Sequence, residues 1–245
     1  MVDFIEAVKR PLRADPVTIA MGVIFGIFPF TRPLLHGLGI EAARRTFTGN
    51  TEMPGFDDFI DAFLSGLVVL VITILFFLPA LGVLALGAAA AFPLVMDILR
   101  NIPINPSVSV QALMTLVVGG AIFGSVALLL SLLAAIMLPV AVQLYAHDKH
   151  VSSAFSFRKI FRVVATAPYW IATVLMMGYG IALLGLVSVI SLPEFNALSV
   201  VFLGIAFYMW WMTWYIVMSQ VVHESGVLGH TKHAHETTTK RKKKR

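Results

Sequence analysis

The chain has 245 residues, of which 58% are hydrophobic and only 13% are charged. Soluble domains contain about 45–50% apolar and about 25% charged residues. The composition and a mean hydropathy of +0.88 therefore exclude a disordered chain, a coiled coil and an ordinary water-soluble enzyme, and they indicate an integral membrane protein with several helical spans.

The net charge of +5 belongs to the C-terminal end of the chain. Residues 223–245 contain seven Lys and Arg residues and two Glu residues, so residues 1–222 are neutral, with 11 charges of each sign. This distribution argues against a body that binds nucleic acid specifically. Cysteine is absent, which excludes disulfides, thiolate catalysis and cysteine-based metal sites.

Residues 1–15 are predicted to form an interfacial amphipathic helix. Phe4, Ile5, Val8 and Leu12 recur at helical spacing, and the segment mixes acidic with basic residues. A short helix of this kind lies on the bilayer surface with its apolar side chains inserted. We expect no cleavable signal peptide, because no basic start leads into a short apolar stretch.

Residues 16–222 are predicted to form a transmembrane domain, an all-α bundle of about five to six spans. One span needs about 20 apolar residues. A six-span interpretation has the right parity for both chain ends to lie on one side. Its spans would be approximately residues 17–38, 62–78, 80–96, 110–136, 165–190 and 198–222.

Two parts of this domain allow alternatives. Residues 62–96 have no charge over a length that suits either two short spans broken near Pro79 or one long kinked helix, and Pro139 raises the same question for the next stretch. Residues 17–47 form either a span followed by a loop or a re-entrant helix pair. Pro29, Arg32 and Pro33 favour a break there.

The orientation follows from the positions of Lys and Arg. Residues 147–162 and the tail are basic, whereas residues 101–108 and 191–197 contain no Lys or Arg. We therefore expect a cell-membrane protein whose N-terminus, 147–162 loop and disordered tail, residues 223–245, lie in the cytoplasm. Anionic headgroups or partners would contact the basic side chains of Arg158, Lys159, Arg162, Lys240, Arg241, Lys242, Lys243, Lys244 and Arg245. The tail histidines, His230, His233 and His235, could bind a metal, but a solvated tail is the favoured interpretation.

Two polar boundaries of the chain look alike. Residues 37–67 and 138–164 each contain a helix end, a polar turn and a Phe-rich segment that leads into the next span. The first is acidic where the second is basic. Weak internal symmetry of this kind is common in membrane folds built from repeats.

These two windows carry a family resemblance. The matching residues are Gly39, Arg44, Arg45, Gly49, Met53, Pro54, Phe56, Asp58, Gly66, Pro139, Tyr145, Ala146, Ala154, Phe155, Phe157 and Arg158. The pattern resembles a prokaryotic, largely archaeal membrane family, domain of unknown function 4013. The departures are Ile40 after the glycine, Met53 for Leu and Phe56 for Trp. The resemblance implies a multi-pass membrane protein and brings no catalytic residues.

Asp57, Asp58 and Asp61 are the densest acidic group. They follow Pro54-Gly55 at an expected helix start, where carboxylates favour the positive end of the helix dipole. We interpret them as structural charges that cap this helix and pair with the basic boundary, rather than as a metal site.

Other residues suggest a cavity or helix contacts. Arg32, His36, Tyr208, Trp211 and Tyr215 are candidate cavity-lining residues, although the aromatic residues would also suit packing inside the bundle. The Gly22-x3-Gly26 and Gly120-x3-Gly124 patterns predict close helix packing or a homodimer interface.

The sequence predicts no catalytic, cofactor-binding or metal-binding residue, because the expected spans lack charged side chains and enzyme motifs are absent. The expected function is non-enzymatic: membrane organisation, or a membrane subunit that binds lipids or partners. The alternative is a transporter or permease-like component for an apolar or lipid-like substrate. Expected partners are membrane lipids and either other membrane subunits or a second copy, with no specific nucleic acid.

Overall fold

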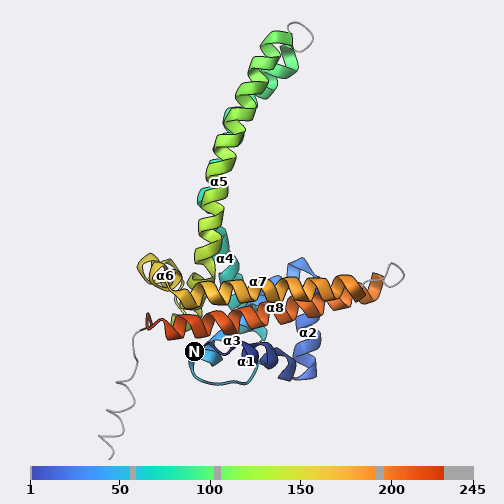
Figure 1. Ribbon diagram of the computed structural model, residues 1–245, viewed down its shortest axis with the longest axis vertical. Coiled ribbons are helices and arrows are strands. Elements are labelled where there is room, and N and C mark those ends of the chain that lie inside the picture. The colour runs from blue at the N-terminus through green and yellow to red at the C-terminus, as the bar shows by residue number, and fades with distance from the viewer. Residues whose placement is uncertain (1, 56–58, 102–105, 191–195, 229–245) are drawn as a thin grey trace, which may run out of the picture. The chain divides into compact units, whose positions relative to one another are not determined.

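The computed structural model describes residues 2–55, 59–101, 106–190 and 196–228, and within these ranges it is helical without any strand. The helices are α1 (Phe4–Lys9), α2 (Pro16–Ile27), α3 (Arg32–Phe47), α4 (Phe59–Asn101), α5 (Pro106–Asp148), α6 (Phe157–Val164), α7 (Ala167–Ile190) and α8 (Asn196–Glu224), as Figure 1 shows. Short 3-10 turns precede α2, α3 and α6: η1 (Arg10–Arg13), η2 (Pro29–Thr31) and η3 (Val151–Phe155). The all-α membrane fold is confirmed.

Four of the described helices are long and apolar enough to cross a membrane, fewer than the five to six predicted. They are Ile60–Arg100, Val110–Asp148, Ala167–Val189 and Leu198–Glu224. Two local features explain the difference. Pro79 lies inside α4 without ending it, which a membrane helix tolerates. Residues 17–38 form no single span, because α2 ends at Ile27 and α3 begins at Arg32.

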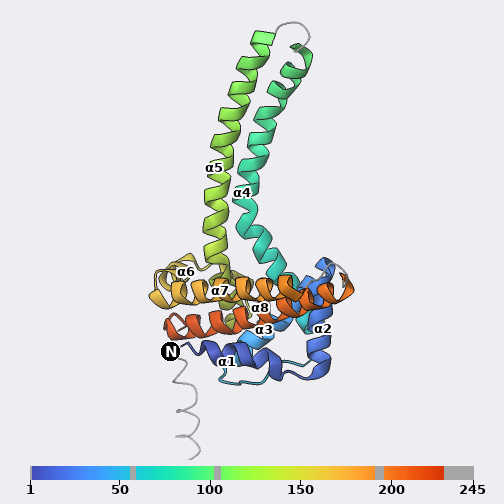
Figure 2. The same cartoon turned by 45° about the vertical axis from the view of Figure 1, so that its right-hand side comes forward.

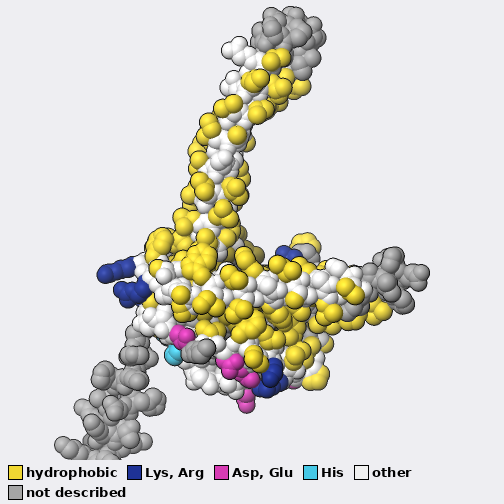
Figure 3. All heavy atoms as spheres, in the orientation of Figure 1, with side chains coloured by type: hydrophobic (Ala, Val, Ile, Leu, Met, Phe, Trp, Pro, Cys, Tyr) yellow, Lys and Arg dark blue, Asp and Glu magenta, His cyan; other side chains and the backbone are white. Residues whose placement is uncertain are grey.

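The chain divides into two compact units, residues 71–138 and the remainder. In the first of these, α4 and α5 run antiparallel and side by side, as Figure 2 shows. The helices approach closely at Gly87, where an added Cβ would lie 2.8 Å from the Cβ of Phe123. Apolar side chains cover the visible surface of this hairpin (Figure 3), as expected for a surface solvated by lipid chains.

The other unit is organised around α8, which packs against α2, α3 and α7. Gly22 lies against Tyr208 and Gly26 against Gly204, so α2 runs antiparallel to α8. Further along α3, its residues meet positions progressively later in α8. Arg32 lies over Phe207 and Gly39 lies against Tyr215, so α3 runs parallel to α8.

Helices α2 and α3 therefore run in opposite directions along α8. Helix α2 runs toward the N-terminal end of α8. The chain turns at η2, level with residues 204–207, and α3 runs back toward the C-terminal end of α8. This geometry agrees with the re-entrant alternative for residues 17–47. It returns Arg44 and Arg45 to the end of the unit from which α2 began.

The N-terminal segment is helical, as predicted, in α1 and η1, and it docks on this same end. The backbone N–H of Asp3 donates to Oε1 of Gln220 at 3.0 Å, and the ring of Phe4 packs edge-on against Tyr179. Ile5 and Leu12 remain exposed. That these exposed side chains insert into a bilayer surface stays a prediction.

Candidate functional site

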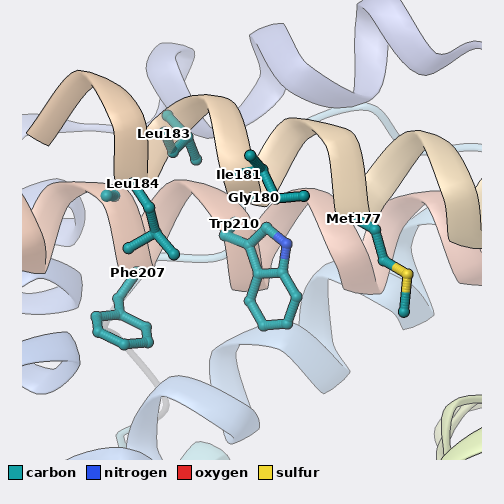
Figure 4. Close-up of a pocket in the computed structure, with 8 residues that line it drawn as sticks. Met177, Gly180, Ile181, Leu183, Leu184, Phe207 and Trp210 are labelled. Atoms are coloured by element: carbon teal, nitrogen blue, oxygen red, sulfur yellow. The ribbon is translucent and has the colours of Figure 1, made fainter. Parts of the chain in front are cut away.

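An apolar groove lies between α7 and α8. It has a volume of about 460 Å³, within the range of roughly 300–1,000 Å³ that is typical of small-molecule sites. Figure 4 shows its walls, which are Met177, Gly180, Ile181, Leu183 and Leu184 from α7 and Ala206, Phe207 and Trp210 from α8. None of the described side chains that line it carries a charge, so the groove suits a hydrocarbon group.

Local geometry keeps the wall of this groove apolar. Gly180 allows the indole of Trp210 to approach α7, since an added Cβ would lie 2.8 Å from Nε1. That indole N–H donates to the backbone carbonyl of Met176 at 3.1 Å. The one polar atom of the Trp210 side chain is therefore occupied by the backbone, and its ring carbons remain to line the groove.

Phe207 links the groove to Arg32. The guanidinium carbon of Arg32 lies 5.9 Å from the centroid of the Phe207 ring, within cation–π range. The Arg32 side chain is exposed at the start of α3. In the part of the chain that the structure describes, no carboxylate forms an ion pair with it.

The other candidate cavity residues lie in packed contacts. His36 meets Trp211 edge-on at 4.7 Å, and its Nδ1 shares a hydrogen bond of 2.8 Å with the hydroxyl of Tyr215. Tyr208 is separate from this cluster. It lies against Gly22, and its hydroxyl donates to the carbonyl of Pro11 at 3.4 Å.

Three of the five candidate cavity residues, His36, Trp211 and Tyr215, thus lie together in one packed cluster. The groove is lined instead by Phe207 and Trp210, which are close to them in the sequence. Sequence reasoning missed these two residues because the whole stretch 207–215 is rich in aromatic residues. The helical spacing of Met177, Ile181 and Leu184 around Gly180 was the one available signal, since these residues share a face of α7.

Helix α6 presents three different faces. Ile160 and Val163 are buried against the protein, whereas Phe157 and Phe161 are exposed along one flank. Arg158 and Arg162 are exposed on the side opposite Ile160. A helix with exposed aromatic and exposed basic rows suits the interface between acyl chains and headgroups.

The two polar boundary windows meet at Arg44. Its Nε donates to the carbonyl of Ala146 at 3.2 Å, and its guanidinium lies 5.9 Å from the Tyr145 ring. Nη1 reaches Oγ of Ser65 and Oε2 of Glu41, each at 3.5 Å. One residue of the first window thereby holds the end of α5 from the second window.

A polar pocket of about 260 Å³ surrounds this junction. Glu41, Arg44, Arg45, Asp61 and Lys149 are its charged lining residues. Lys149 ends α5 with φ of 60°, a left-handed conformation that is uncommon for a residue with a side chain. Asp61 thus lies near these cations, whereas Arg158 and Arg162 are exposed on α6.

Asp61 lies in the first turn of α4, where a carboxylate favours the helix dipole. The remaining sequence predictions fall on parts of the chain without a description. Asp57, Asp58 and the tail residues Lys240, Arg241, Lys242, Lys243, Lys244 and Arg245 lie outside the described residues, as do the tail histidines.

Comparison with known proteins supports the resemblance found in the boundary windows. A search of curated proteins and a search of solved structures each gave no match. The model of one protein family matches residues 20–192, which include both windows. The chain therefore belongs to the family described as "Protein of unknown function (DUF4013)".

Proposed function

We propose that the protein is a non-enzymatic membrane subunit that binds lipid. The groove between α7 and α8 holds a hydrocarbon chain, and α6 contacts the headgroups of the cytoplasmic leaflet. The orientation follows from the basic 147–162 loop and the basic tail. With this orientation, the C-terminal end of α8 faces the cytoplasm.

The proposal rests on the apolar lining of the groove. Its wall combines aliphatic side chains with the ring carbons of Phe207 and Trp210, and its described lining residues offer no free side-chain hydrogen-bonding group that a polar substrate would need. Cavities of this kind exclude water and accept apolar groups. The adjacent rows of Phe and Arg on α6 support the same function, because they suit the membrane interface.

Filling the groove tests the proposal. Leu184→Trp would occupy the groove, whereas Leu186→Trp changes an equally exposed residue of α7 that does not line it. Native mass spectrometry of the detergent-purified full chain would count the retained phospholipids. We expect Leu184→Trp to lose a phospholipid that both the parent chain and Leu186→Trp retain. Equal retention by all three proteins would contradict the proposal.

The re-entrant pair α2–α3 favours a second candidate, a permease-like component for a lipid-like substrate. Interrupted membrane helices frequently form substrate sites in transporters, and here the interruption lies level with Phe207 of the groove. Movement of a fluorescent phospholipid between the leaflets of reconstituted vesicles, measured by dithionite quenching, distinguishes the candidates. A transport component accelerates this movement, and a lipid-binding subunit leaves it at the rate of protein-free vesicles.

A further inference from the structure

We infer that the groove selects amphiphiles with an anionic head group, which Arg32 binds while the hydrocarbon chain lies between α7 and α8. This inference rests on the proposed lipid-binding function and adds the class of ligand. Phe207 connects the two parts of the site, because it lines the groove and also lies beneath the guanidinium of Arg32.

The depth of Arg32 supports the need for an anion. Arg32 is level with Phe207, nine residues after the start of the Leu198–Glu224 span. At 1.5 Å per residue, this places it about 14 Å along a helix that crosses a hydrocarbon core of about 30 Å. A charged side chain at such depth is costly unless another charge or water compensates it.

Among the residues that the structure describes, none compensates the charge of Arg32, and this leaves room for a ligand to do so. The Phe207 ring lies beneath Arg32, and the aromatic ring of His36 follows one turn later on α3, so neither of these neighbours supplies a negative charge. Glu6, Glu41 and Asp148 form their ion pairs with other residues, namely Arg13, Arg44, Arg45 and His147.

The chemistry of arginine defines the ligand class. A guanidinium binds the two oxygens of a carboxylate or a phosphate in a bidentate manner, which is stronger than a hydrogen bond between neutral groups. A fatty carboxylate and a single-phosphate lipid both combine such a group with a hydrocarbon chain of the kind that the groove accepts. The shared chemistry is thus one anionic head group next to an alkyl chain.

Three photoreactive probes with the same alkyl chain test the inference on the full chain in nanodiscs of phosphatidylcholine. One probe ends in a carboxylate, one in a phosphate monoester and one in a neutral alcohol. Labelling of α7 and α8 peptides is measured against probe concentration. We expect half-maximal labelling by at least one anionic probe at about tenfold lower concentration than by the alcohol. The anionic probe that reaches half-maximal labelling at the lower concentration shows whether the ligand is a fatty carboxylate or a single-phosphate lipid.

Arg32→Gln should remove this tenfold preference and leave labelling by the alcohol unchanged, and Arg32→Lys should restore part of it. Leu184→Trp should reduce labelling by all three probes, with Leu186→Trp as its matched control. An undiminished anionic preference in Arg32→Gln, or equal labelling by all probes in the parent chain, would overturn the role of Arg32. Absence of groove labelling by any probe would instead overturn the proposed lipid-binding function.

Discussion

Arg10 joins the N-terminal segment to the turn that follows α3. Its Nε donates to the carbonyl of Thr51 at 2.8 Å, Nη1 to Oγ1 of Thr46 at 2.9 Å and Nη2 to the carbonyl of Asn50 at 2.8 Å. The side chain is buried, and this burial lowers its pKa, while Glu6 raises it. The guanidinium remains charged, because an arginine pKa is too high for deprotonation in a protein.

Replacing Arg10 therefore tests how strongly the N-terminal segment is held. Arg10→Lys presents one ammonium group in place of a planar fork and cannot reach all three acceptors. We expect the free energy of unfolding of the detergent-solubilised chain to fall by about 1–3 kcal/mol. Arg13→Lys is the control, because Arg13 is exposed and contacts only Glu6 in the described part of the chain. Equal stability of the two variants would contradict a stabilising role of the three Arg10 hydrogen bonds.

Asp15 gives the start of α2 a dependence on pH. Its Oδ1 accepts the backbone N–H groups of Val17 and Thr18, and its Oδ2 accepts the hydroxyl of Thr18. The hydrogen bond from the Thr18 hydroxyl is the largest of the effects that lower the Asp15 pKa. Because the folded pKa lies below the unfolded value of about 3.9, the stabilisation is fully present above that pH.

We accordingly expect this contribution to disappear as the pH falls below about 4, through the lowered pKa of Asp15. Asp15→Asn retains an N-capping side chain without the ionisable group. The midpoint of thermal unfolding should decrease more steeply between about pH 5 and about pH 2 in the parent chain than in Asp15→Asn, because this range spans the ordinary pKa of an aspartate. Parallel pH profiles would show that the charge of Asp15 has no such role.

Sequence patterns identify some of the functional basic residues and not others. The basic residues Arg158 and Arg162 could be recognised from the chain alone, because a solvent-facing row follows directly from helical spacing. Arg10 could not, since its partners are about 40 positions away and contribute mostly backbone atoms. The same applies to the pairing of Arg32 with Phe207, which depends on how α3 crosses α8.

Three aromatic residues of α8 each pack on a glycine of another helix. Tyr208 lies against Gly22 of α2, Tyr215 against Gly39 of α3 and Trp210 against Gly180 of α7. Small residues allow membrane helices to approach closely, which compensates for the absence of a hydrophobic driving force between them. The Gly22-x3-Gly26 pattern thus acts within the chain, whereas Gly120 and Gly124 have no described atom within 4 Å of an added Cβ.

A pair of alanine substitutions tests this packing. In Gly39→Ala the new Cβ would lie 2.2 Å from Cδ2 of Tyr215, so α3 or the ring must move. We expect destabilisation of about 1–3 kcal/mol, as for other overpacked interiors. Gly178→Ala meets no described atom within 4 Å and should be neutral or slightly stabilising, because Ala favours helix more than Gly. Circular dichroism during unfolding measures both, and a neutral Gly39→Ala would contradict the packing.

Helix α4 is longer than a bilayer requires. Its charge-free residues 62–96 extend about 52 Å at 1.5 Å per residue, against a hydrocarbon core of about 30 Å. Tilts of up to about 40° shorten this projection only to about 40 Å. A continuous α4 must therefore carry apolar residues beyond the hydrocarbon core.

Single cysteine substitutions can show which α4 residues lie outside the hydrocarbon core, because the chain has no cysteine of its own. Cysteine replaces exposed α4 residues, from Leu64 to Leu99, and a maleimide that cannot enter the bilayer is applied to both sides of the membrane. We expect one protected window of about 20 residues, with reactive positions within the charge-free stretch beyond it. Two protected windows separated by reactive positions near Pro79 would favour the two-span alternative.

The long helices illustrate what periodicity and composition can predict. The apolar stretches predicted α7 and α8 with nearly correct ends, because length and charge alone define a candidate span. The six-span interpretation divided α4 into two spans and ended the next span at residue 136, whereas α5 continues to Asp148. Whether Pro79 breaks a helix or only bends it depends on neighbouring contacts, which the sequence does not display. The break between α2 and α3 was visible as Pro29, Arg32 and Pro33, but its re-entrant course required the contacts with α8.

Across the whole molecule, two apolar surfaces of similar composition differ in shape. The α4–α5 hairpin carries apolar side chains along its visible surface (Figure 3), whereas α7 and α8 enclose a groove between them. A surface that is only solvated by lipid exchanges its lipid freely, whereas a groove that surrounds one chain holds it specifically. This difference separates a lipid-binding protein from one that merely resides in the membrane.

Photo-crosslinking by a phospholipid with a diazirine in its acyl chain tests this distinction most directly. The full chain is reconstituted in nanodiscs, and labelled peptides are identified with and without excess unlabelled phospholipid. We expect saturable labelling at Met177–Leu184 and Ala206–Trp210, and non-saturable labelling along α4 and α5. Equal, non-saturable labelling of the groove and the hairpin would contradict a specific lipid site.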